Sequence, residues 1–394
     1  IGLDAAWELD FWGRFRRGVE SASANLGASV ADYDSALVSL TSEVARTYVT
    51  IRTLEERLAI AENNTLTQQR SYHIADVRFR NGAVSELDPS QALSLLKSTE
   101  STVPKLRSQI RQVKNALSIL LGMPPGELKD ILEGASGIPE VPRQLNVGIP
   151  ADLLRRRPDI RRAELQAAAQ SARIGIAKSE LYPRIALIGS IGLLNGDTGN
   201  NGNSDLFKSD SLAYQFGPSF SWKILNYGRL KNQVRLQDAR LEELLVNYQN
   251  QVLEAAREVE DGISSFLGAR DQASYLAESV KAAQRSVDLA LVQYREGAVD
   301  YQRVLDTQKT LLATQDAYTS VRGDTVRALI ATYKALGGGW EIRAGKPFVP
   351  EERQKEMKQR TDWGHLLDAA PQPAELSKVP PTGKEQPLLN KPDW

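Results

Sequence analysis

The sequence contains no cysteine and only two histidines among its 394 residues, and these shortages exclude several kinds of site. Without cysteine there are no disulfides, iron–sulfur clusters, cysteine-ligated zinc sites or thiol nucleophiles. His73 and His365 lie far apart in the sequence, so a histidine-rich metal site or a Ser-His-Asp triad is not expected. We also find no phosphate-binding loop, dinucleotide fingerprint or nucleophile motif. We therefore expect no catalysis, no metal and no cofactor.

The sequence also lacks an excess of charge and a long apolar run. Lys and Arg together number 49, as do Asp and Glu, so the formal net charge is +0. A nucleic-acid-binding protein usually carries a strong basic excess, so we expect no nucleic-acid partner. No segment approaches ~18 uninterrupted apolar residues, and no transmembrane helix is predicted.

An internal repeat relates the two halves of the sequence. Segments 7–14, 79–84 and 121–122 resemble segments 222–229, 294–299 and 336–337, and each pair is 215 positions apart. The repeat is far longer than the units of solenoid proteins, so it indicates a duplicated half-molecule. The second copy is preceded by residues 150–220, whose counterpart would lie before Ile1. We therefore expect at least ~65 further residues there, including any secretion signal or lipid-anchor cysteine.

Two long segments in equivalent positions have the period of packed helices. Between residues 14 and 80 there is no proline, and apolar residues recur at alternating steps of three and four. This period is typical of helices that pack side by side, and such a helix would extend roughly 100 Å. The equivalent stretch is 229–295. Gly82 and Gly297 follow as expected left-handed C-caps, and second helices are predicted over about 85–121 and 300–336. Each half is thus predicted to be a long helical hairpin.

Alternation with a period of two marks the segments between these helices. The odd positions of residues 1–11 and the even positions of residues 214–223 are apolar, and residues 185–193 form a weaker third segment. A tilted β-barrel strand needs this alternation, because one face meets lipid and the other a wet lumen. A soluble sheet packed against the helices is the alternative. The predicted lipid-facing aromatic residues are Trp7, Phe11, Tyr214, Phe216, Phe220 and Trp222.

The number of predicted strands bears on the assembly. Three strands, or four with one before Ile1, cannot close a barrel, since bacterial outer-membrane barrels have at least about eight. An open sheet edge is not tolerated in lipid. If these strands span a membrane, several chains must therefore share one barrel.

The most specific motif is Pro-Ala-Asp-Leu-Leu-Arg-Arg-Arg-Pro-Asp-Ile-Arg-Arg-Ala-Glu at residues 150–164. This motif, its continuation to residue 185, and segments 7–14 and 294–299 resemble the TolC-like outer-membrane efflux factors, in particular their NodT-type branch. The resemblance covers about residues 1–341. It implies a homotrimer with a 12-stranded β-barrel in the Gram-negative outer membrane, in contact with its lipid, above a large periplasmic α-barrel. Such a trimer is the passive exit duct of a tripartite drug or solute efflux pump, which also needs a periplasmic adaptor (membrane fusion) protein and an inner-membrane RND-type transporter.

The predicted fold class is therefore mainly α with a small antiparallel β part. We expect a transmembrane strand at residues 1–13, the first helical-hairpin half at 14–122, and an inter-repeat connection with a helix at 123–182. A transmembrane β-hairpin should follow at 183–226, with a long exposed loop near 195–211, and then the second hairpin half at 227–339. Residues 340–394 form a polar tail, equatorial or disordered, to which we assign no function.

The resemblance also implies a gate where the hairpins converge. In similar channels an Asp in the position of Asp306 forms an acidic ring, and three carboxylates around one axis favour cations or proton uptake. Gln302 stands one turn earlier, where the family often has an apolar sealing residue, and Arg303 and Tyr301 are candidates to hold neighbouring chains together. An ordinary solvated carboxylate is the alternative for Asp306. The residues predicted to contact the adaptor at the two tips are Gly82, Val84, Ser85, Leu87, Gly297, Val299 and Asp300, with Ser85 in an N-cap-like place.

Five arginines between residues 155 and 162 form a basic block. No aromatic residue is interleaved with them, so structural ion pairs are favoured over nucleic-acid binding. Pro158 and Asp159 suit the first turn of a helix. For the chain as a whole, the main alternative function is that of a soluble periplasmic helical-hairpin adaptor or scaffold, which would need no detergent and would expose no lipid-facing strands.

Overall fold

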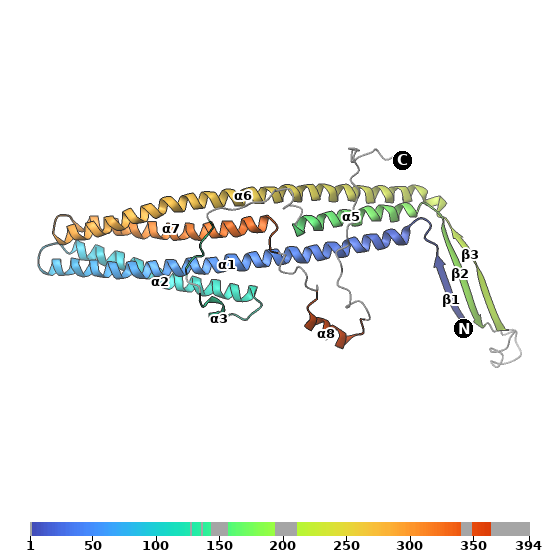
Figure 1. The fold of residues 1–394 in the computed structure, drawn as a ribbon, viewed down its shortest axis with the longest axis horizontal. Coiled ribbons are helices and arrows are strands. Elements are labelled where there is room, and N and C mark those ends of the chain that lie inside the picture. Colours follow the sequence, from blue (N-terminus) through green and yellow to red (C-terminus); the bar gives the residue numbers. More distant parts are fainter. Residues whose placement is uncertain are drawn as a thin grey trace. The chain divides into compact units, whose positions relative to one another are not determined.

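The computed structural model describes residues 2–126, 128–134, 137–142, 157–193, 211–339 and 349–363. The chain is mainly helical with one small antiparallel sheet, as the sequence predicts (Figure 1). The predicted loop near 195–211 and the first residues of the 150–164 motif lie almost entirely outside the described residues. The elements in chain order are β1 (Gly2–Glu8), α1 (Arg14–Arg80), α2 (Leu87–Leu120), α3 (Lys129–Leu132), α5 (Pro158–Ser179), β2 (Arg184–Leu193), β3 (Leu212–Ser221), η3 (Ile224–Asn226), α6 (Tyr227–Arg295), α7 (Tyr301–Ala335) and α8 (Glu351–Arg360).

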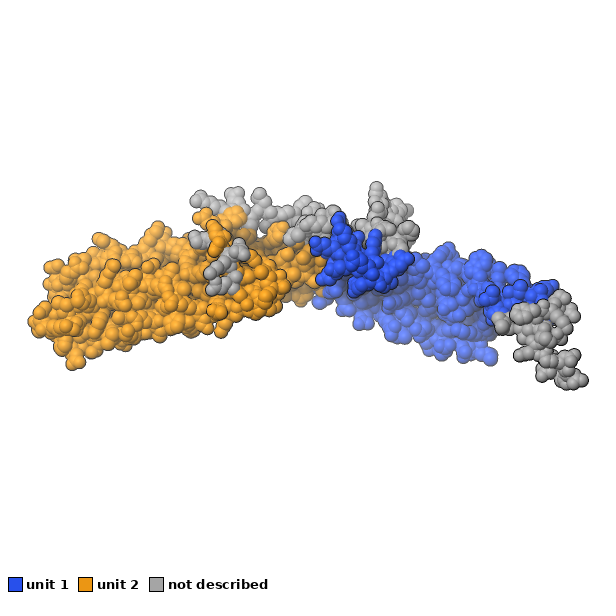
Figure 2. All heavy atoms as spheres, turned by 90° about the horizontal axis from the view of Figure 1, so that it is seen from below, with its two compact units in different colours: residues 1–32, 161–250, 342–394 blue, residues 33–160, 251–341 orange. Residues whose placement is uncertain are grey.

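The chain divides into two compact units, coloured blue and orange in Figure 2. Unit 1 comprises residues 1–32, 161–250 and 342–394, and so contains the sheet, most of α5 and the beginnings of α1 and α6. Unit 2 comprises residues 33–160 and 251–341 and contains the remainder of α1 and α6 with α2 and α7.

The two long helices have nearly the predicted bounds. Helix α1 has 67 residues and α6 has 69, and α6 begins at Tyr227, slightly earlier than the repeat alignment predicts. Neither helix contains proline, so the backbone hydrogen-bond ladder is not interrupted along either. The prediction of two long helical hairpins is confirmed.

All four hairpin helices end in the same backbone motif. Gly82, Gly122, Gly297 and Gly337 have φ angles of 71°, 71°, 76° and 80°, in the left-handed region that glycine adopts without steric cost. At the first, the Gly82 N–H donates to the Phe79 carbonyl and the Ala83 N–H donates to the Arg78 carbonyl, each at 2.8 Å. The same two bonds recur at the other three glycines and define a Schellman cap. The four glycines form two pairs 215 positions apart, so the segment between the two caps of a hairpin has the same length in both halves.

Small apolar clusters hold unit 2 together. All four hairpin helices contribute to one cluster at their tips, and others lie further along, including one of Leu54, Ala61, Leu106 and Ile110 between α1 and α2. Close helix approach is set by glycine: a Cβ atom on Gly262 of α6 would lie 2.8 Å from the hydroxyl of Thr332 on α7. The tip cluster comprises Ala75, Ala92, Leu95, Ala290, Tyr294, Tyr301, Val304 and Leu305.

The sheet in unit 1 has β2 between β1 and β3, and both pairings are antiparallel. The register aligns Leu3 with Ile191 and Ile191 with Tyr214, so the apolar positions of the three strands share one face. The apolar face carries Leu3, Ala5, Trp7, Ile185, Leu187, Ile191, Leu193, Leu212, Tyr214, Phe216 and Phe220. The opposite face carries Asp4, Glu8, Arg184, Ser190, Gln215, Ser219 and Ser221, with Ile188 as its large apolar exception.

The apolar face of the sheet is exposed in the chain. The exposed fractions of Leu3, Tyr214 and Phe216 are 77%, 78% and 79%. A soluble sheet packed on the helices would bury one face, and within the described residues this burial is not observed. Exposed apolar surface of this extent requires a partner, either lipid or protein.

Two further observations concern helices. None of the described helices combines the length and the apolarity needed to cross a bilayer.

In the region predicted as a polar tail, residues 351–360 form α8, which has no buried residue. Glu351 and Glu352 in its first turn and Lys358 and Arg360 in its last turn complement the helix dipole, a signal that apolar periodicity misses. Residues 340–348 and 364–394 lie outside the described residues.

Candidate functional site

The tip of unit 2 is built around two buried tyrosines. Tyr294 from the end of α6 and Tyr301 from the start of α7 are each 1% exposed, and their rings meet edge to face with centroids 5.2 Å apart. Both belong to the apolar cluster shared by the four helices. Tyr301, predicted as a contact between neighbouring chains, thus packs inside its own chain and fixes the start of α7.

Arg78 of the first hairpin caps the end of α6 in the second. Its guanidinium donates hydrogen bonds to the carbonyls of Tyr294 and, at 3.4 Å, Arg295, and it lies 4.7 Å above the Tyr294 ring. A cation at a helix C-terminus satisfies carbonyls that have no intrahelical partner. Arg78 is not among the site residues predicted from the sequence. Its position four residues before Gly82, at the end of a long helix, is the only sequence feature that indicates a role in capping.

Tyr294 also joins the hairpins through its hydroxyl group, which donates a hydrogen bond to the Asp88 carboxylate of α2 at 3.0 Å. Burial, the bond to Asp88 and its charge together raise the pKa of Tyr294 well above its ordinary value. Burial raises the pKa of Tyr301 in the same direction, with a smaller contribution from Asp88. Both phenols are therefore neutral at physiological pH, and Tyr294 is a hydrogen-bond donor.

Three of the four predicted gate residues are exposed on the first turns of α7: Gln302, Arg303 and Asp306. The Gln302 amide donates to the Asp306 carboxylate at 3.0 Å, and the Gln91 amide of α2 reaches Gln302 at 3.5 Å. Gln91 is the repeat counterpart of Asp306, 215 positions earlier. Gln302 stands where the family often has an apolar residue. Its polar side chain connects Asp306 of the second hairpin to Gln91 of the first.

The predicted adaptor-contact residues occupy the two interhelical turns. Gly82, Ser85, Gly297 and Asp300 are exposed, and Val84 and Val299 are half-buried. Leu87 is 61% exposed. Asp300 is the N-cap of α7 and accepts a hydrogen bond from the Arg303 backbone N–H at 3.3 Å.

Ser85 does not cap α2. The N-cap position is taken by Glu86, and no side-chain cap bond is present. The helix begins at Leu87, later than predicted, and Pro89, which has no backbone N–H to satisfy, is buried within its first turn.

A ladder of polar contacts connects α1 to α7 above the tip. Arg57 and Asp316 form a two-pronged ion pair at 2.6 and 3.0 Å, and Asn64 donates to Gln315 at 2.8 Å. Gln308 donates to Ser71 at 2.6 Å, whereas the buried amide of Gln68 has no partner among the described residues. The contacts between α1 and α7 thus include buried polar pairs as well as apolar ones, such as Val49 with Val326.

Unit 1 contains the junctions between strands and helices. The Trp12 ring stacks on Tyr182 at 4.5 Å and its indole N–H donates to the Pro183 carbonyl at 2.8 Å. Trp222 donates to the Leu181 carbonyl at 3.1 Å, so both junctions are tied to the turn between α5 and β2. Burial alone would raise the pKa of the Glu180 carboxyl, but its contacts with Arg184 and Lys223 outweigh this and lower it.

The basic block supplies structural ion pairs, as expected. Arg157 is 7% exposed and contacts Asp159 at 2.7 Å and Glu258 at 2.8 Å, and it donates to the Ala335 carbonyl at the end of α7. Burial alone would raise the pKa of Asp159, but the hydrogen bonds and charge of Arg157 outweigh it and lower that pKa. A Cβ on Gly337 would lie 3.0 Å from the Arg157 side chain. Glycine is therefore needed at this position both for its positive φ angle and for its lack of a side chain.

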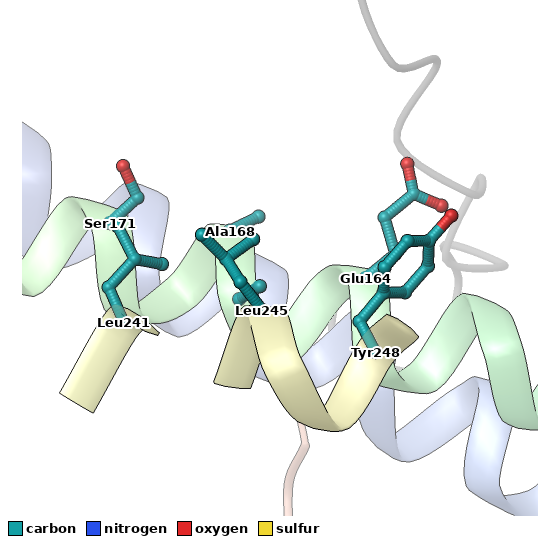
Figure 3. Close-up of a pocket in the computed structure, with 7 residues that line it drawn as sticks. Glu164, Ala168, Ser171, Leu241, Leu245 and Tyr248 are labelled. Atoms are coloured by element: carbon teal, nitrogen blue, oxygen red, sulfur yellow. The ribbon is translucent and has the colours of Figure 1, made fainter. Parts of the chain in front are cut away.

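Two grooves lie on the surface of the described residues. One, of about 390 Å³, lies between α5 and α6, with small residues on one wall and larger ones on the other (Figure 3). It is lined by Glu164, Ala167, Ala168, Ser171, Leu241, Leu245 and Tyr248. The second, of about 380 Å³, is apolar and lies in unit 2 beside Tyr48, Leu117 and Val326. No cluster of metal-binding side chains occurs in the described part of the chain.

Comparison with known proteins identifies the family. The family model described as outer membrane efflux protein matches residues 1–123 and 149–338, and the chain belongs to this family. The chain is 34% identical over 342 residues to the pyoverdine export outer membrane protein OpmQ of Pseudomonas aeruginosa, covering 86% of this chain and 70% of OpmQ. It is 30% identical over 340 residues to nodulation protein T of Rhizobium leguminosarum bv. trifolii, covering 86% of this chain and 71% of that protein.

Solved structures agree with this assignment. The outer-membrane channel OprN superposes with a TM-score of 0.82 at 33% identity, over 86% of this chain and 75% of that one. The resemblance to the NodT-type outer-membrane efflux factors and the outer-membrane localisation with a large periplasmic helical part are thereby confirmed.

Proposed function

We propose that three copies of this chain form the exit duct of a tripartite efflux pump, with their strands sharing one 12-stranded barrel in the outer membrane. The observation that carries this proposal is the sheet: its apolar positions share one exposed face, its polar positions share the other, and β1 and β3 each present an outer edge without a partner among the described strands. Such edges are not tolerated in lipid, so the sheet must be completed by other strands. The duct is passive, and its driving energy comes from the partner transporter.

In this proposal Asp306, Gln302 and Arg303 line the constriction at the periplasmic tip. One Asp306 carboxylate per chain gives three around the trimer axis, and Gln302 holds each in place. Like charges at close quarters attract cations and repel one another, which keeps the closed state easy to release. The buried ring of Tyr301, in the apolar tip cluster, fixes the first turn of α7, which carries these three residues.

Opening of the tip requires the second hairpin to move away from the first. The contacts that resist this movement are the Tyr294–Asp88 hydrogen bond, the Arg78 cap on α6 and the polar ladder between α1 and α7. Polar contacts can be exchanged for water at modest cost, unlike a sealed apolar interface. The polar contacts therefore lower the cost of movement between two states, whereas the apolar tip cluster resists it.

The partners in this proposal are a periplasmic adaptor and an inner-membrane RND-type transporter. The exposed turns at Gly82 and Gly297, with Val84, Leu87 and Val299 beside them, provide small apolar contacts for an adaptor. The substrate named for a relative, such as pyoverdine for OpmQ, is not assigned to this chain. A passive duct with a polar lining discriminates only weakly between solutes.

The decisive experiment uses the full-length protein in its native membrane. We expect it to be extracted only with detergent, to migrate as a trimer after cross-linking, and to form narrow cation-selective pores in planar bilayers. Recovery as a monomer in the aqueous periplasmic fraction would refute the duct and support the adaptor alternative.

A further inference from the structure

The connection between β3 and α6, residues 222–227, exposes an unusual amount of apolar surface; we name this segment the elbow. The exposed fractions of Ile224 and Leu225 are 59% and 101%, and those of Trp222 and Tyr227 are 44% and 40%. Single exposed apolar residues are common at protein surfaces, whereas four large ones within six residues indicate a contact surface.

The internal repeat provides a comparison for the elbow within the same chain. The residue equivalent to Leu225 is Asp10, whose carboxylate accepts hydrogen bonds from the backbone N–H groups of Phe15 and Arg16 at 3.0 and 3.1 Å. Asp10 thus caps α1. The Leu225 side chain cannot accept a hydrogen bond. The elbow therefore has a fully exposed apolar side chain at the position where Asp10 caps a helix in the first repeat.

The charges beside the two junctions also differ. In the first repeat Arg14 and Arg16 have acidic partners, Glu8 at 3.3 Å and Asp10 at 3.3 Å. Their counterparts Arg229 and Lys231 are exposed and have no acidic partner within the described ranges. Lys231 instead lies 5.2 Å from the centre of the Tyr227 ring, at the elbow itself. The apolar elbow is therefore followed, at the start of α6, by two cations without acidic partners among the described residues, whereas Lys223 within the elbow is paired with Glu180.

We propose that the elbow is an interfacial anchor that inserts Ile224 and Leu225 into the periplasm-facing leaflet and binds anionic phospholipid headgroups through Arg229 and Lys231. The inference rests on the proposed function, because it requires β3 to span the outer membrane. Two observations specify lipid as the occupant. The elbow follows directly in sequence on β3, whose apolar face ends at Phe220, and the neighbouring cations match phosphate, as in amphipathic membrane-surface helices.

Residues 1–394 contain no cysteine, so a cysteine introduced among them places the label at one known position, and the unsubstituted full-length protein gives the labelling background. We would introduce single cysteines as Leu225→Cys, Phe216→Cys and Glu296→Cys in the full-length protein, label them with an environment-sensitive fluorophore, and reconstitute each trimer in phosphatidylcholine vesicles. Nitroxide lipids labelled near the headgroup or deep in the acyl chain then report depth. Residue 216 tests the membrane-spanning sheet, and residue 296, in the exposed turn at the tip, is the negative control.

We expect the probe at 225 to be quenched more strongly by the shallow nitroxide than by the deep one, the probe at 216 to be quenched, and the probe at 296 to be unaffected. Quenching at 216 without quenching at 225 would overturn the anchor while the proposed function stands, and would indicate that a second copy or another protein covers the elbow. No quenching at 216 would refute the membrane-spanning sheet, and the anchor with it.

A second measurement tests the lipid class. At equal mole fraction, nitroxide-labelled phosphatidylglycerol should associate with the elbow roughly fivefold better than nitroxide-labelled phosphatidylcholine, since each surface cation adds to anionic-lipid binding. The double variant Arg229→Gln, Lys231→Gln should remove this preference and leave shallow quenching at 225 in place. The pair Arg235→Gln, Arg240→Gln further along α6 is the matched control. A preference unaffected by the first pair would overturn the assignment of the two cations.

Discussion

The hydroxyl group of Tyr294 donates a hydrogen bond to the Asp88 carboxylate at 3.0 Å and thereby joins the second hairpin of the chain to the first. The bond lies next to the Arg78 contact with the end of α6, so the tip is held at two neighbouring points. Because a hydrogen bond to an ionised group contributes about 1.5–3 kcal/mol, its loss changes a two-state equilibrium more than tenfold.

The substitution Tyr294→Phe should therefore favour the open state. We expect more frequent openings and a higher mean conductance in planar bilayers, with trimer assembly unchanged because the buried ring is kept. Tyr301→Phe is the matched control, since it removes a neighbouring phenol for which no hydrogen bond is found in the described chain. Equal conductance of the Tyr294→Phe and parent channels would contradict the role assigned to this bond.

The substitution Asp306→Ala should widen the proposed constriction and remove its negative charge. We expect single-channel conductance to rise several-fold and the preference for cations to fall, because the smaller side chain also releases Gln302. Asp288→Ala is a close control: Asp288 accepts a hydrogen bond from Gln284 at 3.1 Å, the same one-turn spacing as Gln302 and Asp306. An unchanged conductance in Asp306→Ala would count against the gate.

Alkaline pH should loosen the tip. The folded-state pKa values of Tyr294 and Tyr301 are raised above the ordinary value of about 10, so the neutral phenols stabilise the closed tip fully below pH ~10 and lose this effect as the pH rises toward their folded-state values. Limited proteolysis at the tip turns, measured between pH 8 and pH 11, should accelerate above pH ~10. In the double variant Tyr294→Phe, Tyr301→Phe this alkaline acceleration should disappear; its persistence would assign the effect to other groups.

The substitution Arg157→Gln should lower the thermal stability of the protein strongly. It leaves the half-buried Asp159 without its cation, and breaking a buried pair costs about 3–5 kcal/mol. Arg257→Gln removes an equally paired but exposed arginine and should have almost no effect. Similar Tm losses for both variants in the same detergent would contradict the structural role of Arg157.

The same pair predicts an acid limit. The folded-state pKa of Asp159 is lowered, so its ionised form contributes stability above the unfolded value of about 3.9, and this contribution is lost as the pH falls through the folded value. Melting curves between about pH 2 and pH 5 should show a smaller loss of Tm on acidification in Asp159→Asn than in the parent, and an equal loss in both would contradict this assignment.

The parts of the fold with long-range periodicity could be predicted from the sequence. The 3.5-residue period and the absence of proline define α1 and α6, and the period-two alternation defines β1 and β3, because these patterns repeat over many residues. The exact beginning of α2 could not be predicted, since Ser85 has the chemistry of a cap but the N-cap position is occupied by Glu86, which makes no side-chain cap bond. Helix α8 was missed because its charges, and not an apolar stripe, favour it.

The candidate site was less accessible to sequence reasoning. Gln302 and Asp306 could be chosen from a motif. The contact of Gln302 with Gln91, 211 positions earlier, depends on how the two hairpins pack, and the hydrogen bond between Gln302 and Asp306 depends on their side-chain rotamers. Burial of Tyr301 depends on the same packing, as does the role of Arg78. Side-chain partners of this kind are tertiary facts that no local pattern contains.

The unpaired outer edges of β1 and β3 have a consequence for biogenesis. A solitary copy cannot rest in a bilayer with bare amide groups facing hydrocarbon, so in the proposed trimer insertion and oligomerisation must be a single event. One misfolded subunit would then inactivate the two intact subunits of its trimer. Missense alleles that disrupt the sheet should therefore act dominantly when they are co-expressed with the intact gene.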